Sequence, residues 1–540
     1  MKGFHNLRLN GIPRYPRNLY VSPALGSFRK TLKLSDSFLW DVLSLVAGGM
    51  YTLAFAPFNL HYSVFPALAY LFWSSLPLLP KRACLRGYLF GLGQFSLGVS
   101  WVYVSIHDYG GGGVLGSLII TALFVGFWSL FPALSVYLTA KLPINKFDRL
   151  IFFPLLWILI EYLRGNLILD GFPWLQIAHS QLDTPLTGYI PLFGNYGTGL
   201  LAALIATFLI KLFTPSRYSN IVIIIVIVIW VAGEVLKSIE WTRPMGPPIK
   251  VTLVQGNMAQ DKKWLPETRA STILQYISMT EQHWDSQVIV WPESAVPAYL
   301  SDVYESFLRP LHENAKSHQT DIIVSVPSYG KAEGEKYNSV ITLGENAGIY
   351  RKVHLLPFGE YMPWQPLSGW ILGYFDLRLS HFTPGSPEQP LLRAGGYPFI
   401  TSICYEDAFA ENALRGVSKA AYLVNATNDG WFGNSIEPHQ HLQIARMRAL
   451  ETGRYMLRST NTGVTAIVSP DGQILSWAPL FRATTLTGMI HPMAGLTPYA
   501  HIGDRPIIIF ILSLLFLMLI IDNYEKIDRL ILAGKFRRKA

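Results

Sequence analysis

Residues 400–407 read ITSICYED, an apolar stretch that ends at Cys404 and gives way at once to acidic residues. This pattern is typical of a buried strand that ends at a functional edge of a sheet. Similar strand patterns recur in VTLVQGN (251–257), QVIVWPES (287–294), DIIVSVPS (321–328), NSVITLG (338–344), YLVNATND (422–429) and TGVTAIVSP (462–470). Helical patterns lie between several of them, near residues 266–284, 300–317 and 438–457. Residues 248–495 are therefore predicted to form an α/β domain with two sheets packed together.

Three of these segments carry reactive side chains to the ends of strands. VIVWPES (288–294) delivers Glu293, GIYRKVHLLPFGE (348–360) delivers Lys352, and ITSICYED delivers Cys404. A thiol is mostly protonated at neutral pH, so a nucleophilic Cys404 needs a base, and a buried Glu293 with a raised pKa can take the proton. Lys352 can then stabilise the negative charge of a tetrahedral intermediate.

Each of these residues also has an ordinary interpretation. Cys404 alone would more often be a packed core thiol, and Lys352 alone a surface charge. Glu293 is harder to explain in that way, because a carboxylate directly after a buried strand needs a partner. The three residues together favour nucleophilic catalysis through Cys404.

The composition predicts a membrane protein. Of the 540 residues, 50% are hydrophobic and 15% are charged, whereas soluble domains carry about 25% charged residues. The net charge is +9, but the basic residues lie in short segments between apolar runs, so no nucleic-acid partner is expected. Two cysteines are too few for a disulfide framework or a thiolate zinc cluster. Residues 248–495 contain no GxGxxG or Walker-type loop, so a nucleotide cofactor is not implied. Neither a cofactor nor a metal is expected.

About eight apolar segments are candidate membrane spans, since a helix needs roughly 20 apolar residues to cross the hydrocarbon core. Residues 37–240 hold about seven of them and residues 505–522 hold the last. The candidates are residues 39–57, 63–80, 86–106, 114–140, 149–164, 196–213, 220–237 and 505–522. The α/β domain is thus predicted to be inserted between the last two spans of an α-helical membrane bundle.

Basic residues occupy alternate connections between these spans. They cluster in an arm at residues 1–36, in the second, fourth and sixth loops, and in a tail at residues 523–540. By the positive-inside rule both termini are expected in the cytoplasm and residues 248–495 on the outer face. The outer loop 165–195 is a candidate aromatic platform at the membrane interface, with Phe172, Trp174, Tyr189 and Phe193.

At the trio the sequence resembles the nitrilase, or carbon–nitrogen hydrolase, superfamily, whose catalytic residues are Glu, Lys and Cys in this order. The contexts VWPES, YRKVHLLPFGEYMP and ICYED all match. Over nearly its whole length the chain is similar to the apolipoprotein N-acyltransferase family. The further matches are EYLRG, GFPWLQIAHSQ, QGNMAQDKKW, NDGWFG and QHLQIARMRALETGRY followed by STNTGVTAIVSPDG. The resemblance implies a nitrilase-like αββα sandwich joined to a membrane bundle of eight spans.

The resemblance also implies a ping-pong acyl transfer in the bacterial inner membrane, with a periplasmic catalytic domain. Cys404 would take the sn-1 acyl chain of a phospholipid as a thioester, and the α-amine of a diacylglyceryl-cysteine on an apolipoprotein would accept it. Glu293 would act as base and then acid, and Lys352 as charge stabiliser. Matching positions imply supporting roles for Glu360, Glu406 and Tyr405, and a lipid path past Trp264, Phe358 and Trp431.

Two other functions are compatible with parts of the sequence. A membrane-tethered amidase could hydrolyse a small C–N substrate through the same trio, although such a substrate would not require eight spans. A transporter or channel with an outer ligand-binding domain is less compatible, because the spans lack paired intramembrane charges and an internal repeat.

Overall fold

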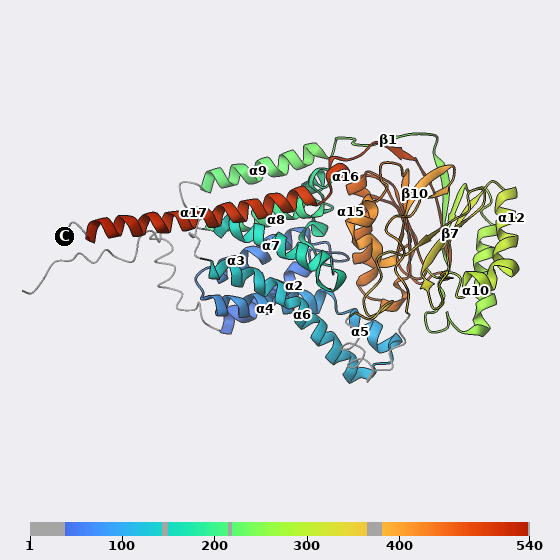
Figure 1. Cartoon of the computed structure of the whole chain (residues 1–540), viewed down its shortest axis with the longest axis horizontal. Helices are drawn as coiled ribbons and strands as arrows, with labels where there is room; N and C mark the ends of the chain where they lie inside the picture. The colour runs from blue at the N-terminus through green and yellow to red at the C-terminus, as the bar shows by residue number, and fades with distance from the viewer. Residues whose placement is uncertain (1–37, 143–148, 214–218, 364–380, 538–540) are drawn as a thin grey trace, which may run out of the picture.

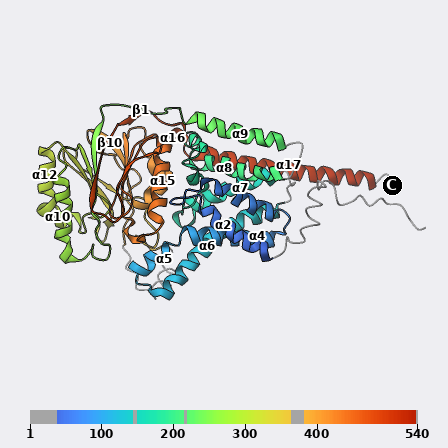
Figure 2. The same cartoon turned by 180° about the vertical axis from the view of Figure 1, so that it is seen from behind.

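Helices form one end of the molecule and a β-sandwich forms the other (Figure 1). The computed structural model describes residues 38–142, 149–213, 219–363 and 381–537. The predicted basic arm, residues 1–36, lies outside these ranges. Figure 2 shows the same two-part arrangement from behind, with α17 (Arg505–Arg537) running along the helical end beside α8 (Ile190–Phe213).

The sandwich consists of two six-stranded sheets, each with a parallel centre. The first has the order β15 (Thr484–Ile490), β2 (Ile249–Gln255), β3 (Val288–Val290), β4 (Asp321–Ser325), β7 (Ser339–Leu343) and β8 (Gly348–Arg351). The second has the order β14 (Ile474–Trp477), β13 (Ala466–Val468), β12 (Met456–Thr460), β11 (Tyr422–Thr427), β10 (Tyr397–Ile403) and β9 (Leu392–Ala394). The short pairs are β1 (Arg243–Pro244) with β16 (Met493–Ala494), and β5 (Ser328–Tyr329) with β6 (Lys336–Tyr337).

The main core of the sandwich lies between the two sheets. Alternate residues of β2, Val251 and Leu253, share one buried cluster with Ile403 of β10 and Val424 of β11, as the period of two in a strand requires. The outer face of the first sheet is covered by α10 (Pro266–Glu281), α11 (Leu300–Val303) and α12 (Arg309–Ser317). The second is covered by α14 (Ala410–Leu414) and α15 (Glu437–Thr452). This is the predicted αββα sandwich.

Each segment predicted to span the membrane contains helix. The helices are α2 (Phe38–Thr52), α3 (Val64–Ser75), α4 (Pro80–Gly98) with α5 (Val102–Val104), α6 (Gly113–Lys141), α7 (Arg149–Asn166), α8 (Ile190–Phe213), α9 (Ser219–Leu236) and α17 (Arg505–Arg537). Within the described residues, three helical segments are long and apolar enough to cross a membrane, or four if the pair bent by 60° after Gly98 is one span. The count of eight spans therefore stays a prediction.

One predicted helix is shorter than expected. The pattern near residues 438–457 predicts a single helix, but α15 ends at Thr452 and β12 begins at Met456. Gly453 takes the left-handed conformation with φ +62° and ends the helix, which a residue without Cβ does at little cost. Residues 453–457 were therefore assigned to the wrong element.

Helix α15 lies between the sandwich and the helical end, and it contacts the loop that was predicted to be an aromatic platform (Figure 1). Phe172 and Trp174 of that loop are buried. The Trp174 indole donates a hydrogen bond of 2.9 Å to the Gln440 side chain of α15 and stacks on Tyr405. For these two residues the platform prediction is wrong, because their rings fill the junction between the two parts of the molecule.

Candidate active site

Cys404 lies where strand β10 ends and a 3₁₀ turn, Cys404–Ala408, begins. Its backbone has φ +50°, a left-handed conformation that is unfavourable for a residue with a side chain. Two contacts hold the turn in this shape: the Asn425 amide donates to the Cys404 carbonyl at 3.2 Å, and the Ile403 N–H donates to the Glu406 carboxylate at 2.8 Å. Backbone strain of this kind persists only where the surroundings enforce it, as at many active sites.

Lys352, which follows β8, is buried among carboxylates. Its ammonium lies 2.8 Å from Glu360 Oε2 and 3.9 Å from Glu293 Oε1. The Asn338 amide nitrogen donates to both carboxylates, at 2.8 Å to Glu293 and 2.9 Å to Glu360. Asn338 thereby sets the spacing of the two acids around one cation.

Glu406 connects the strand end that carries Cys404 with the one that carries Lys352. Its Oε1 accepts hydrogen bonds from the Tyr350 hydroxyl (2.9 Å) and from the N–H groups of Val353 (2.7 Å) and His354 (3.0 Å). Its other oxygen accepts from Ile403. The predicted supporting residue Glu406 thus ties the backbone beside Lys352 to the backbone beside Cys404.

The electrostatics of the trio are set by burial. Burial, reinforced by the Glu293 carboxylate and opposed by Lys352, raises the pKa of the Cys404 thiol to about 12. Burial also raises the pKa of Glu293 above its ordinary value, although Lys352 opposes this. Burial alone would lower the pKa of Lys352, but Glu360 and Glu293 hold it above its ordinary value. The thiol is therefore protonated at rest, next to a carboxylate and a permanent cation.

A second buried lysine, Lys263, lies beside the trio. It belongs to the turn after β2, and its ammonium donates to the Glu293 carbonyl oxygen at 3.0 Å. Burial lowers its pKa to about 8, while the charges of Glu293 and Cys404 act in the opposite direction. The sequence patterns did not single out Lys263.

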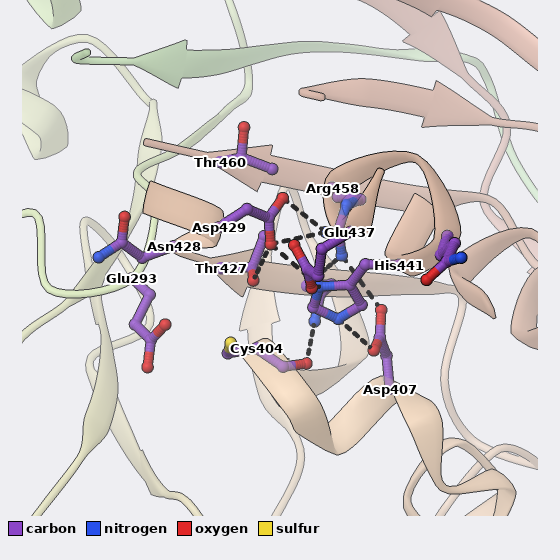
Figure 3. Close-up of polar contacts among 12 residues, drawn as sticks. Glu293, Cys404, Asp407, Thr427, Asn428, Asp429, Glu437, His441, Arg458 and Thr460 are labelled. Carbon is purple, nitrogen blue, oxygen red and sulfur yellow. Dashed lines mark hydrogen bonds and ion pairs between the residues drawn. The ribbon is translucent and has the colours of Figure 1, made fainter. Parts of the chain in front are cut away.

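On the other side of Cys404 lies a buried ionic cluster, which we define as Asp407, Asp429, Glu437, His441 and Arg458 (Figure 3). His441 bridges two carboxylates, with Nε2 2.8 Å from Asp407 and Nδ1 3.0 Å from Asp429. Arg458 contacts the same two carboxylates, at 3.2 and 3.0 Å. Burial and Arg458 disfavour a charged imidazole, but Asp407 and Asp429 hold the pKa of His441 well above its ordinary value.

This ionic cluster reaches Cys404 through Asn425. The Arg458 guanidinium donates to the Asn425 side-chain oxygen at 2.6 Å, and the amide nitrogen of Asn425 donates to the Cys404 carbonyl. Asp407 belongs to the same 3₁₀ turn as Cys404. The cluster therefore supports the strained turn from behind, while the thiol points toward Glu293 (Figure 3).

One group in the cluster has the spacing of a cation site. Ligand atoms of Asp429, Glu437 and His441 lie within 4.8 Å of one another. Both ring nitrogens of His441 already face carboxylates, however, and both oxygens of Asp429 accept from Arg458. Because a metal ligand must offer a free lone pair, the geometry fits internal neutralisation better than a bound cation.

The aromatic residues predicted near the site fall into two groups. Trp264, Phe358 and Trp431 are exposed, by 47%, 39% and 38%. Tyr405 is buried, and its hydroxyl donates to the Gly171 carbonyl oxygen at 2.7 Å in the helical part. The first group is available to a ligand, whereas Tyr405 connects the nucleophile turn to the junction.

The structure brings Glu293, Lys352, Cys404, Glu360 and Glu406 into one site. It adds residues that the patterns did not single out: Lys263, Asn338, Asn425 and the ionic cluster. For Lys263 a signal was present, because it stands directly before Trp264 in the matching motif QGNMAQDKKW. Asn425 and Asp429 likewise stand in the strand-end pattern YLVNATND.

Comparison with known proteins covers both parts of the chain. The model of the apolipoprotein N-acyltransferase N-terminal domain matches residues 47–208, and the carbon-nitrogen hydrolase model matches residues 250–499. An apolipoprotein N-acyltransferase of Methylococcus capsulatus is 48% identical over 470 residues, covering 86% of this chain and 93% of the relative. One of Coxiella burnetii is 40% identical, covering 88% and 99%. Among solved structures, Saccharomyces cerevisiae Nit3 aligns at 19% identity with a TM-score of 0.34, covering 45% of this chain and 90% of that chain, a likeness too weak to carry an argument.

Proposed function

The chain belongs to the apolipoprotein N-acyltransferase family, and from that membership we propose that it moves an acyl chain from a phospholipid to an apolipoprotein through Cys404. The acceptor is the α-amine of the diacylglyceryl-cysteine at the apolipoprotein N-terminus, and the donor ester is at sn-1. The observation that carries the proposal is the strained Cys404 turn beside the Glu293–Lys352 pair. A thiol, a carboxylate and a fixed cation are the groups that acyl transfer through a thioester requires.

In the first half-reaction Glu293 takes the thiol proton and the Cys404 sulfur attacks the ester carbonyl carbon. Negative charge moves to the carbonyl oxygen, where the Lys352 ammonium stabilises it. The intermediate collapses with cleavage of the carbon–oxygen bond, and Glu293 returns the proton to the leaving alkoxide. The products are an acyl thioester on Cys404 and a lysophospholipid.

In the second half-reaction the neutral α-amine of the apolipoprotein attacks the thioester carbonyl carbon. Glu293 accepts a proton from the nitrogen as the carbon–nitrogen bond forms. The carbon–sulfur bond then breaks, and Glu293 returns that proton to the departing thiolate, which regenerates the Cys404 thiol. The raised pKa of Glu293 suits both roles, because a base that must also act as an acid works best with a pKa near the ambient pH.

Glu360 and Glu406 act as supporting residues in this scheme. Glu360 pairs with Lys352 at 2.8 Å and accepts from the Leu356 N–H at 2.8 Å, which positions the ammonium. Glu406 holds the backbone on both sides of the site. Neither carboxylate needs to touch the substrate in order to matter.

Attachment to a membrane explains the helical part of the chain. Both substrates are lipids, and lifting an acyl chain out of a bilayer costs about 0.8 kcal/mol per methylene. A catalytic domain fixed by spans to the outer face of the bacterial inner membrane, with both termini in the cytoplasm, avoids that cost. The exposed rings of Trp264, Phe358 and Trp431 would line the path of the chains from the membrane lipids.

Hydrolysis of a small amide is not favoured. Relatives named apolipoprotein N-acyltransferase align over both the helical part and the sandwich. A tethered amidase would use the same trio but would have no need of the helical part.

The test is incubation of the detergent-purified protein with a phospholipid labelled in its sn-1 chain. We expect label on the protein that neutral hydroxylamine removes, because hydroxylamine cleaves thioesters. Cys404→Ala should carry no label, and Cys84→Ala, the matched control at the other cysteine, should be labelled like the wild type. Adding a diacylglyceryl peptide should then move the label to the peptide amine.

Absence of label from a folded wild-type protein in lipid-containing detergent would contradict the proposal. Label on Cys404→Ala would assign the nucleophile elsewhere. Label on an sn-2 chain alone would keep the thioester but change the donor position.

A further inference from the structure

The trio and its supporting acid leave the site with an excess of negative charge. Lys352 contacts two carboxylates, Glu360 and Glu293. When Glu293 takes the thiol proton, one negative charge disappears from the acid and another appears on sulfur. Lys352 attracts this new charge on sulfur only in part, because Glu360, 2.8 Å from the ammonium, already compensates some of its positive charge.

Lys263 supplies a cation that this balance lacks. It is buried to the same extent as Lys352, at 1% exposure for each. Its ammonium lies against the Glu293 backbone, 3.0 Å from the carbonyl oxygen, and it interacts electrostatically with both Glu293 and Cys404.

The hydrogen bonds of Lys263 leave capacity for a substrate. In the parts of the chain that the structure describes, the Glu293 carbonyl oxygen is the one hydrogen-bond acceptor of this ammonium. An ammonium has three N–H groups, so two remain. A buried charge with spare donors beside a nucleophile is unfavourable for folding and therefore points to a role in the reaction.

Resting on the proposed function, we propose that Lys263 is a second cationic group of the active site, which stabilises the negative charge as it passes from the Cys404 sulfur to the oxygen of the tetrahedral intermediate. Lys352 and Lys263 divide the work. Lys352 stabilises the oxyanion while it is also paired with Glu360, and Lys263 adds its spare donors to the stabilisation of the developing charge.

The experiment compares Lys263→Met with Lys262→Met and Lys263→Arg. Methionine keeps the length and removes the charge. Lys262 is the exposed neighbour and serves as the matched control, and Lys263→Arg retains the charge. All are made on Cys84→Ala, so that Cys404 is the remaining thiol of the two in the chain. The two readouts are the rate of thioester formation from sn-1-labelled phospholipid and the rate of Cys404 alkylation by iodoacetamide at pH 8.

We expect Lys263→Met to slow thioester formation by about 10²-fold, the effect of removing one stabilising donor. Alkylation should slow by about tenfold, since loss of a neighbouring positive charge lowers the thiolate fraction. Lys262→Met should match the parent in both assays, and Lys263→Arg should stay within about tenfold of it. Alkylation does not depend on acyl transfer, so it separates failure of this inference from failure of the proposed function.

Two results would overturn the inference. One is a folded Lys263→Met protein with parental rates in both assays. The other is a folded Lys263→Arg protein that is as slow as Lys263→Met, because charge would then not be the property that matters. If Lys263→Met does not fold, Lys263→Gln replaces it, since its amide keeps an N–H donor for the Glu293 carbonyl.

Discussion

Charged residues lie on both sides of Cys404, and the two sides differ in how completely they are paired. On the substrate side, Lys352 has one close contact with Glu360 and a longer one, 3.9 Å, with Glu293, and Lys263 keeps spare donors. On the far side, the ionic cluster forms several contacts between 2.8 and 3.2 Å around His441 and Arg458. Pairing in the ionic cluster is denser but not complete, because Glu437 Oε2 and Arg458 Nε lack a hydrogen-bond partner among the described residues. The loosely paired side is the one suited to chemistry, and the densely paired side is the one suited to support.

This difference predicts that variants on the substrate side lose activity while variants on the far side lose stability. A catalytic group needs hydrogen-bond donors or charge that are unpaired in the resting site and that interact with the transition state. A buried ion pair whose charges already contact each other mainly holds the neighbouring chain segments in position. The predictions below test that division, from the largest expected effect to the smallest.

Glu293→Gln should abolish most of the activity and leave the protein folded. We expect thioester formation to fall by about 10³-fold, within the range for loss of a general base. The Asn338 amide can still hydrogen-bond to a glutamine oxygen, so the melting temperature should change little. Single-turnover labelling with an sn-1-labelled phospholipid measures the first effect, and thermal unfolding measures the second. A folded variant with more than a tenth of the parental rate would remove Glu293 from the role of base.

Arg458→Met should have the opposite profile. Removing one partner of a buried ionic group costs about 3–5 kcal/mol in the free energy of unfolding. The Asp407 and Asp429 carboxylates would lose one of their two cationic partners and keep only His441. The control is Arg415→Met, whose pair with Glu411 is exposed and should contribute less than about 1 kcal/mol. Denaturant unfolding of both variants makes the comparison. If Arg458→Met and Arg415→Met had the same free energy of unfolding, the ionic cluster would not support the fold.

Lys352→Met should slow thioester formation by about 10²-fold, the usual effect of losing one oxyanion stabiliser. Its partner Glu360 would remain buried without a cation, so some loss of stability should accompany the loss of rate. The same labelling assay measures the rate. A change of less than tenfold would assign the stabilising role to Lys263 alone.

The pH dependence of the labelling rate should reflect the substrate side of Cys404, and the pH dependence of the melting temperature should report on the fold. Burial raises the pKa of Glu293, and the proposed base must be ionised, so the rate should fall as the pH drops through this raised pKa. The midpoint should therefore lie above about 4.3, the ordinary value for glutamate. Labelling rates and melting temperatures measured over the same pH range distinguish titration of the base from unfolding. A rate that stays constant down to pH about 4.3 would contradict the raised pKa.

Thr427→Val should have the smallest effect. The Thr427 hydroxyl donates to Asp429 at 3.3 Å, within an otherwise well-paired cluster. Valine keeps the shape and removes one hydrogen bond, which is worth about 1 kcal/mol. Urea unfolding should show that loss, and the labelling rate should be unchanged. If the labelling rate fell while the free energy of unfolding stayed the same, Thr427 would act on the reaction and would belong with the residues on the substrate side of Cys404.

The sequence by itself determined the local elements and the three reactive residues. A period of two in β-branched segments predicts strands without knowledge of their neighbours, and the ends of parallel strands bring polar residues to one edge. Glu293, Lys352 and Cys404 each follow such a strand, so their convergence could be predicted. The C-terminal end of α15 was not predicted, because it depends on the conformation of Gly453.

Only the tertiary structure decided which charges surround the thiol and which rings fill the junction. Arg458 lies 51 positions from Asp407, and Trp174 lies 266 positions from Gln440. No local pattern encodes such pairs, since they depend on how two sheets and a helical bundle pack together. Burial then sets the chemistry: it raises the pKa of Cys404 and lowers that of Lys263. The same residues in an exposed loop would have ordinary pKa values, because water would solvate their charges.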